Sequence, residues 1–232
     1  MGVMVVATDN HSSENGTRGQ LLVSLRSQPY DNVTLDFMAD NGTWTFSNEQ
    51  TTTGLRLSKD NAIFSTTLPL VFAPSGNGKW NSAQTVWVES IIDHIDEGSL
   101  GHDNQTFNVW ISQASVDSNQ KDTLYDNDSL VKSNISVNSI GAFQDNLTLV
   151  SSDNDTARVI LTHADNTSSE AGDNGSFTIK LQTRPLDNVT IFFNDNDTSG
   201  RSLGLRFIPD NLTFTGQTDN WSTSRTVVFG SR

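Results

Sequence analysis

Cysteine is absent from the 232 residues of this sequence, basic side chains are scarce, and apolar runs are short. The lack of cysteine excludes a disulfide framework and any metal site built from thiolates. No apolar run approaches the about 20 residues of a membrane-spanning helix. Residues 1–4 lead into a predicted strand without the basic and apolar regions of a signal peptide. We therefore expect a soluble segment that does not insert into membranes, with any export signal or anchor outside these residues.

Lys and Arg together number 14 against 27 Asp and Glu, which gives a formal net charge of −13. The excess is uneven, because residues 1–155 hold 19 acidic and 7 basic side chains whereas residues 156–232 hold 8 and 7. A surface of this charge repels nucleic acid and anionic lipid, and it attracts cations. The composition therefore argues against nucleic acid as a partner.

The sequence repeats itself at a distance of 156 residues. The stretch Ser13-Glu14-Asn15-Gly16 returns as Ser169-Glu170-Ala171-Gly172, and the Pro-x-Asp-Asn-Val-Thr motif at 29–34 returns at 185–190. The distance shortens further along the chain, so the first copy has longer loops near residues 38–53 and 65–79. The repeat predicts two tandem domains, 1–155 and 156–232, the second incomplete because it has no counterpart of residues 93–155.

Alternation of apolar and polar residues dominates the chain and predicts short strands bounded by Asn, Asp, Gly or Pro. The clearest strands are predicted at 21–25, 33–37, 85–88, 107–111 and 147–150. Helix signals are nearly absent, and residues 113–130 are predicted to be a long loop. Trp80 and Trp221 occupy matching positions in the two copies and are expected to pack at one end of each domain. Many short strands with frequent turns predict an all-β fold of two immunoglobulin-like antiparallel β-sandwiches.

Asparagine followed by any residue and then Ser or Thr is the acceptor sequence for N-glycosylation, and it is strongly enriched here. Fifteen of the 23 asparagines head such a sequon, where the Ser and Thr content alone predicts about six. The sequons lie at Asn10, Asn15, Asn32, Asn41, Asn104, Asn127, Asn134, Asn146, Asn154, Asn166, Asn174, Asn188, Asn196, Asn211 and Asn220. The enrichment favours a glycosylated extracellular protein, although crowding of Asn, Ser and Thr in turns also produces sequons by accident.

Several motifs occur in a consistent order along the chain. After the Ser-Glu-x-Gly and Pro-x-Asp-Asn-Val-Thr motifs come Gln84-Thr85-Val86-Trp87-Val88, Asp93-His94-Ile95-Asp96-Glu97-Gly98, Asp153-Asn154-Asp155-Thr156-Ala157, Leu212-Thr213-Phe214 and Asn220-Trp221. This order resembles tandem Calx-beta-type repeats, which occur in long extracellular, adhesin-type surface proteins of bacteria, archaea and some protists. The resemblance covers most of both copies, except the longer loops and residues 113–140.

The resemblance implies a seven-stranded sandwich with a calcium site at one end. Carried over residue by residue, it nominates as metal ligands Glu14, Asp93, Asp96, Glu97, Asp153 and Asp155. Calcium prefers six to eight oxygen ligands from flexible, carboxylate-rich loops, which agrees with these residues. Where calcium-binding members tend to have two adjacent aspartates, this chain has Asp93-His94 and loses one ligand. The competing interpretation is an acidic, solvated rim without a bound ion.

No catalytic motif is apparent: the four histidines fall in different predicted loops, and no Gly-x-Ser-x-Gly or His-x-x-x-His occurs. The leading hypothesis is a non-enzymatic structural or adhesive segment of a larger glycosylated surface protein or filament, stiffened by calcium and in contact with neighbouring repeats or identical subunits. A second hypothesis is a carbohydrate- or ligand-binding accessory module of a secreted enzyme, with Trp44, Trp87 and Trp110 stacking on cell-surface glycans. A third is a filament subunit whose incomplete second domain is completed by a strand from a neighbouring chain.

Overall fold

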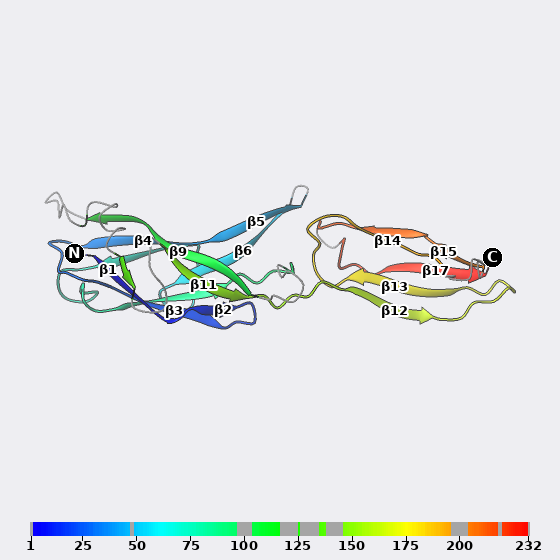
Figure 1. Ribbon diagram of the computed structural model, residues 1–232, viewed down its shortest axis with the longest axis horizontal. Coiled ribbons are helices and arrows are strands. Elements are labelled where there is room, and N and C mark those ends of the chain that lie inside the picture. The colour runs from blue at the N-terminus through cyan, green and yellow to red at the C-terminus, as the bar shows by residue number, and fades with distance from the viewer. Residues whose placement is uncertain are drawn as a thin grey trace. The chain divides into compact units, whose positions relative to one another are not determined.

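The computed structural model describes residues 2–46, 49–96, 104–116, 125, 135–137, 146–195, 204–217 and 220–231. Across these residues the regular structure consists of β-strands, with no helix, so the predicted all-β class is confirmed (Figure 1). With no helix in the described part, none is present that could cross a membrane. The chain forms two compact units. The first comprises Met1–Thr43, Thr52–Asp93 and Gly98–Asn154, and the second comprises Trp44–Thr51, His94–Glu97 and Asp155–Arg232.

Two sheets make up the first unit, except that residues 44–51 of the larger sheet are grouped with the second unit. The six-stranded sheet has the order β10 (Ile135–Val137), β1 (Val3–Asp9), β3 (Arg18–Leu25), β8 (Gln84–Ser90), β6 (Glu49–Ser58) and β5 (Asn41–Phe46). The five-stranded sheet has the order β2 (His11–Ser13), β11 (Asn146–Ser152), β9 (Asn104–Val116), β4 (Val33–Ala39) and β7 (Thr67–Phe72). Most neighbouring strands are antiparallel, whereas β10 runs parallel to β1 and β2 runs parallel to β11.

The core of this unit follows directly from the alternation in the sequence. Along β4, the side chains of Val33, Leu35 and Phe37 are buried while the residues between them are half-buried. They pack in one cluster with residues of the opposite sheet, such as Leu21 and Val86. Because successive side chains of a strand point to opposite faces, each sheet contributes one apolar face to a shared interior. The predicted sandwich is therefore present.

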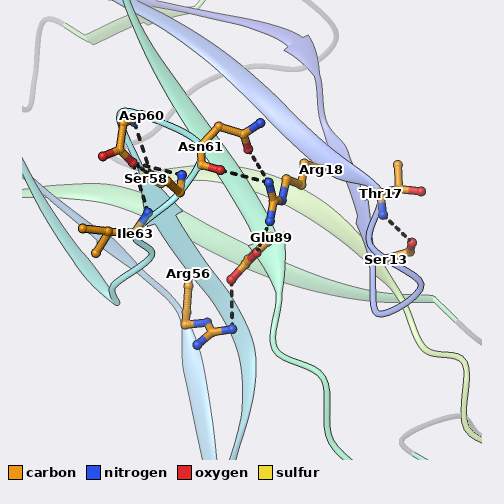
Figure 2. A network of polar contacts seen from close by, with 10 residues as sticks. Ser13, Thr17, Arg18, Arg56, Ser58, Asp60, Asn61, Ile63 and Glu89 are labelled. Atoms are coloured by element: carbon orange, nitrogen blue, oxygen red, sulfur yellow. Dashed lines mark hydrogen bonds and ion pairs between the residues drawn. The ribbon is translucent and has the colours of Figure 1, made fainter.

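A polar network joins three neighbouring strands of the larger sheet (Figure 2). Glu89 on β8 accepts from Arg18 on β3 at 3.1 Å and from Arg56 on β6 at 2.9 Å. The Arg18 guanidinium also donates to the Asn61 side chain at 2.7 Å and lies over the ring of Phe64. Partly exposed ion pairs of this kind each contribute little stability, and the order of the three strands is set by their backbone pairing.

The turn that carries Asn61 is held by a neighbouring carboxylate. Asp60 accepts hydrogen bonds from the Ile63 and Ala62 backbone amides and from the Ser58 hydroxyl. The Ile63 amide is the largest of several donors that lower the pKa of Asp60 to about 2, since all of them favour the charged form. This turn retains its carboxylate bonds down to strongly acidic pH.

The second unit is a smaller sandwich. Its larger sheet has the order β12 (Val159–Asp165), β13 (Gly175–Leu181), β17 (Arg225–Ser231) and β15 (Leu205–Ile208), and its smaller sheet pairs β14 (Val189–Phe192) with β16 (Asn211–Phe214). Phe177, Phe193, Phe207 and Phe229 form a chain of ring contacts in its interior, with centroids 5.6–6.3 Å apart. A Cβ at Gly175 would lie 2.3 Å from the Phe229 ring, so this aromatic packing requires a glycine there.

The two units share the same strand pairing. Val3 lies opposite Leu25 in the first unit, and Val159 lies opposite Leu181 in the second, at the same 156-residue spacing. Even the irregularity in the pairing recurs, after Ala7 in β1 and after His163 in β12. The β14–β16 pair corresponds to β4–β7. Within the described part of residues 155–231, no strand corresponds to β9 or β11.

The structure corrects two details of the sequence-based expectation. Residues 113–116 are not loop, because β9 continues to Val116 and pairs with β4. The insertion near 38–53 is not a simple surface connection, because it contains β5, which extends the larger sheet as an edge strand next to β6. Trp80 and Trp221 pack against the two cores as predicted. Of the remaining residues in the predicted loop, only Tyr125 is described.

Substitutions at equivalent core positions of the two repeats are expected to lower the free energy of unfolding by different amounts. Leu35→Ala removes a fully buried side chain of β4 and should lower the free energy of unfolding by about 2–5 kcal/mol. Ile191→Ala at the matching position of β14 should cost about 1 kcal/mol, because Ile191 is only half-buried. Urea denaturation of both variants measures the difference, and equal losses would contradict it.

Candidate metal centre

Strand pairing places Glu14 beside the end of β11. The short strand β2 runs parallel to β11, with Ser13 opposite Ser152, and the Glu14 amide donates to the Ser152 carbonyl at 3.0 Å. The chain then turns back through Gly16, whose φ of +92° lies in the left-handed region that favours glycine. This turn is the structural meaning of the Ser-Glu-x-Gly motif, and it directs the glutamate toward the residues that follow β11.

Three carboxylates meet at this place: Glu14, Asp153 and Asp155 each offer an oxygen, and these oxygens lie within 4.8 Å of one another. Glu14 is 4% exposed and Asp153 is 7% exposed, whereas Asp155, two residues along the chain, is half-buried. The turn and the chain after β11 are further joined by the Asn154 side chain, which donates to Asn15 at 3.1 Å. Like charges at this separation and burial repel one another strongly.

The cluster fits the requirements of a calcium ion. Two oxygens bound to one ion at about 2.4 Å can lie no more than about 4.8 Å apart, and each pair of the three carboxylates meets this limit. They would supply up to six oxygens if each bound in a bidentate manner, and calcium accepts further carbonyl or water ligands. The chemistry that the group supports is binding of a hard divalent cation.

A buried row of serine hydroxyls supports the same end of the sandwich. Ser90 on β8 forms hydrogen bonds with Ser12 on β2 at 2.9 Å and with Ser151 on β11 at 2.6 Å. All three residues are buried. The network ties together the strand ends that precede Glu14, Asp93 and Asp153. Sequence reasoning missed it, because an isolated serine in an alternating strand carries no distinguishing signal, and only the pairing of distant strands brings these three together.

The acidic loop after β8 is held by its apolar residues, since Ile91 and Ile95 are both buried. Asp93 is half-buried in this loop but is not a member of the three-carboxylate group. Asp96 accepts a hydrogen bond from the Ala157 amide at 2.7 Å and is likewise not a member. Glu97 lies outside the described residues. The structure thus brings together three of the six nominated ligands, and the roles of the other three remain predictions.

One histidine–serine contact invites comparison with a catalytic pair. His11 Nε2 lies 2.8 Å from the Ser152 hydroxyl. In nucleophilic catalysis a third group orients the base through its other ring nitrogen. Here Asp9 accepts a hydrogen bond from the backbone amide of His11 at 2.9 Å, and that bond does not orient the imidazole ring. The contact is accounted for by the pairing of β2 with β11, which places these two residues on adjacent strands.

The predicted glycosylation sites differ in accessibility. Among those whose side chains are described, the exposed asparagines are Asn10, Asn15, Asn154, Asn166, Asn174, Asn188 and Asn211. Asn32 and Asn220 are half-buried, and the side chain of Asn220 accepts from the Thr215 amide at 2.7 Å. The side chains of the other six sequon asparagines lie outside the described residues. So do those of Trp44 and Trp110, whereas Trp87 is half-buried.

Comparison with known proteins gives only distant likenesses. No family model and no curated protein matches the chain. Among solved structures, the calcium binding domain CBD12 of CALX1.1 matches at 14% identity and a TM-score of 0.34, over 97% of this chain and 74% of that one. The apo-form Calx CBD1 domain matches at 13% identity and 0.32, over 66% and 98%. The D0-D1 domain of Intimin matches at 10% identity and 0.26, over 98% and 83%. Likeness at these scores carries no functional argument.

The serine network makes a testable contribution to this end of the sandwich. Ser90→Ala leaves the buried Ser12 and Ser151 hydroxyls without their shared partner, and we expect a loss of about 1–3 kcal/mol in the free energy of unfolding. Ser82→Ala, at an exposed position, is the control and should change stability by less than about 0.5 kcal/mol. Thermal or urea unfolding of the two variants provides the measurement.

Proposed function

We propose that this chain is a non-enzymatic structural or adhesive segment of a glycosylated extracellular protein, and that calcium stabilises its fold. The observation that carries the proposal is the convergence of Glu14, Asp153 and Asp155 at one end of an otherwise apolar sandwich. A sandwich in series with another resists bending and extension, and so holds other parts of a surface protein away from the cell. Residues 153–155 lead from one sequence repeat to the next.

Electrostatics supports calcium in preference to a bare acidic rim. Glu14 and Asp153 are both buried and lie close together, and two like charges in such a place disfavour each other's charged form. A divalent cation would offset the repulsion between them and satisfy several oxygens at once. Any ligand that binds only the folded state stabilises it by mass action. Calcium binding would therefore fasten the Glu14 turn to the chain that follows β11.

Removal of calcium tests the proposal directly. At a calcium concentration 100 times its Kd, the free energy of unfolding should rise by about 2.7 kcal/mol, or about 5–10 °C in Tm. Asp153→Asn should abolish this gain, and chelator should reverse it in the unmodified chain. Differential scanning calorimetry and calorimetric calcium titration provide the two measurements.

Glu170→Gln is the matched control, because Glu170 is the repeat counterpart of Glu14 and is exposed. It should leave the calcium response unchanged. If calcium and chelator leave the Tm of the unmodified chain where it was, the calcium part of the proposal is wrong, and the acidic group is a solvated rim.

The distribution of sequons supports the extracellular and glycosylated parts of the proposal. Seven of the nine sequon asparagines with described side chains are exposed, where a bulky glycan can be attached without disturbing packing. Several lie in turns, such as Asn15 after Glu14 and Asn188 beside Asp187. Glycans at such positions would shield a long-lived surface protein from proteolysis, because turns are preferred cleavage sites.

Mass spectrometry of the native protein tests this part. We expect glycan on the exposed Asn211 and none on Asn220, whose side-chain oxygen is engaged by the Thr215 amide. The two sites lie in the same repeat, so they meet the same host machinery and serve as mutual controls. A native protein without glycan at any exposed sequon would contradict the extracellular, glycosylated assignment.

A further inference from the structure

The sequence contains four Asn-Gly steps, which begin at Asn15, Asn41, Asn77 and Asn174. A glycine after asparagine carries no side chain to shield its amide nitrogen, so this nitrogen can attack the asparagine side chain. Three of the four asparagines head a glycosylation sequon, whereas Asn77 does not. The structure separates Asn77 from the others as well.

Asn77 lies in the exposed stretch 75–79 of the connection between β7 and β8. Gly76 and Gly78 flank it with φ values of +80° and +73°, in the left-handed region that favours glycine. A Cβ added at Gly76 would meet no atom within 4 Å, so the surroundings are open. Among the hydrogen bonds of the described residues, none engages the Gly78 amide or the Asn77 side chain. The two groups that react in an Asn-Gly step are therefore both unrestrained here.

The fold restrains the first Asn-Gly step through two hydrogen bonds. The Gly16 amide, which would be the attacking nitrogen, donates to the Ser13 carbonyl at 3.0 Å. The Asn15 side-chain oxygen accepts from Asn154 at 3.1 Å, and this bond holds the carbon that would be attacked. Groups engaged in this way react only after local opening, so their rate falls with the free energy of that opening.

Strand pairing restrains two further steps. Gly175 is buried in β13 and lies opposite Phe229 of β17. Asn174 itself is exposed, but ring closure requires the glycine nitrogen to turn toward the asparagine side chain, and the paired backbone opposes this rotation. Asn41 is the first residue of β5, so its step also lies in a strand. Asn77 thus begins the Asn-Gly step that the described structure restrains least.

We propose that Asn77 and Gly78 form a site of spontaneous covalent modification, at which the asparagine is converted to aspartate and isoaspartate. The Gly78 nitrogen attacks Cγ of Asn77, the bond from Cγ to Nδ2 breaks, and the proton lost by the nitrogen leaves with the ammonia. Water then opens the cyclic succinimide. Attack of water at Cγ gives aspartate, and attack at the main-chain carbonyl gives isoaspartate, in which the backbone runs through Cβ. Both products add a negative charge, and the reaction needs only water.

Isoaspartate at this position alters the turn that holds Trp80. The Ala73 amide donates to the Gly78 carbonyl, and the Trp80 amide donates to the Ala73 carbonyl, each at 2.8 Å. Trp80 packs against the core of the first unit, and its carbonyl accepts from the Leu25 amide of β3. An additional backbone carbon between Asn77 and Gly78 lengthens the turn that these bonds close. Modification should therefore loosen the packing of Trp80, an effect that involves neither calcium nor glycan.

Peptide mapping of an aged chain tests the site. The whole 232-residue chain, produced without glycosylation, is kept at mildly alkaline pH, where the glycine nitrogen loses its proton more readily. Mass spectrometry detects conversion as a gain of about 1 Da, and electron-transfer fragmentation distinguishes isoaspartate from aspartate. Asn77 should convert at least about tenfold faster than Asn15 and Asn174. The same chain unfolded in guanidinium is the control, and there the Asn-Gly steps should react at similar rates, because the restraints of the fold are gone.

Equal conversion of Asn77 and Asn174 in the folded chain would overturn the inference. So would a preference for Asn77 that persists in guanidinium, because local sequence would then explain it. Asn77→Ser removes the reacting side-chain amide and tests the structural consequence. The aged original chain should lose about 2–4 °C in Tm relative to the aged Asn77→Ser chain. Equal Tm values for the two aged chains, with Asn77 fully converted in the first, would show that the Trp80 turn is not loosened.

Discussion

Coverage of the apolar face of each sheet by the opposite sheet is the constraint on which the rest of this structure depends. A β-strand places every second side chain on one face, so an alternating sequence produces a sheet that is stable in water only when that face is buried. In the first unit a five-stranded and a six-stranded sheet cover each other's apolar faces. Val3, Leu35 and Leu149 are almost fully buried between them. In the described part of the second unit, the four-stranded sheet packs against only two strands, and the side chains of Val159 and Leu161 are about half exposed.

The acidic cluster follows from the same architecture. Strand ends that are distant in sequence meet at one end of the sandwich, because β2 and β11 are neighbours in a sheet and β8 lies in the facing one. Buried hydroxyls of Ser12, Ser90 and Ser151 tie these ends together. Glu14 and Asp153 are then held close by backbone pairing and not by mutual attraction. Burial of two acidic side chains so close together costs free energy, which the rest of the fold must supply.

The sequence alone predicted the fold class, because the apolar–polar alternation and the 156-residue repeat can both be recognised in a single sequence. The family resemblance nominated Glu14, Asp153 and Asp155 together, and the structure places their carboxylates close to one another. It nominated Asp93 and Asp96 as well, and their role as ligands remains a prediction, because acidic residues in loops look alike until the contacts of each are known. Asp96 accepts from the Ala157 amide, a contact that no local pattern foretells. The strand at 113–116 was mistaken for loop because two successive polar residues, Ser112 and Gln113, interrupt the alternation at the point where the pairing with β4 shifts its register.

Comparison of the two repeats shows which strand pairings they share. The β1–β3 and β12–β13 pairs have the same register and the same irregularity, after Ala7 and His163, so equivalent residues of the two repeats direct the same strand pairing. The described residues of the second unit include β12 and β13 and contain no counterpart of β9 or β11. Phe193, Phe177 and Phe229 contact one another through their rings and supply much of the apolar volume of this core. On β12, at the edge of the four-stranded sheet, Val159 and Leu161 remain about half exposed.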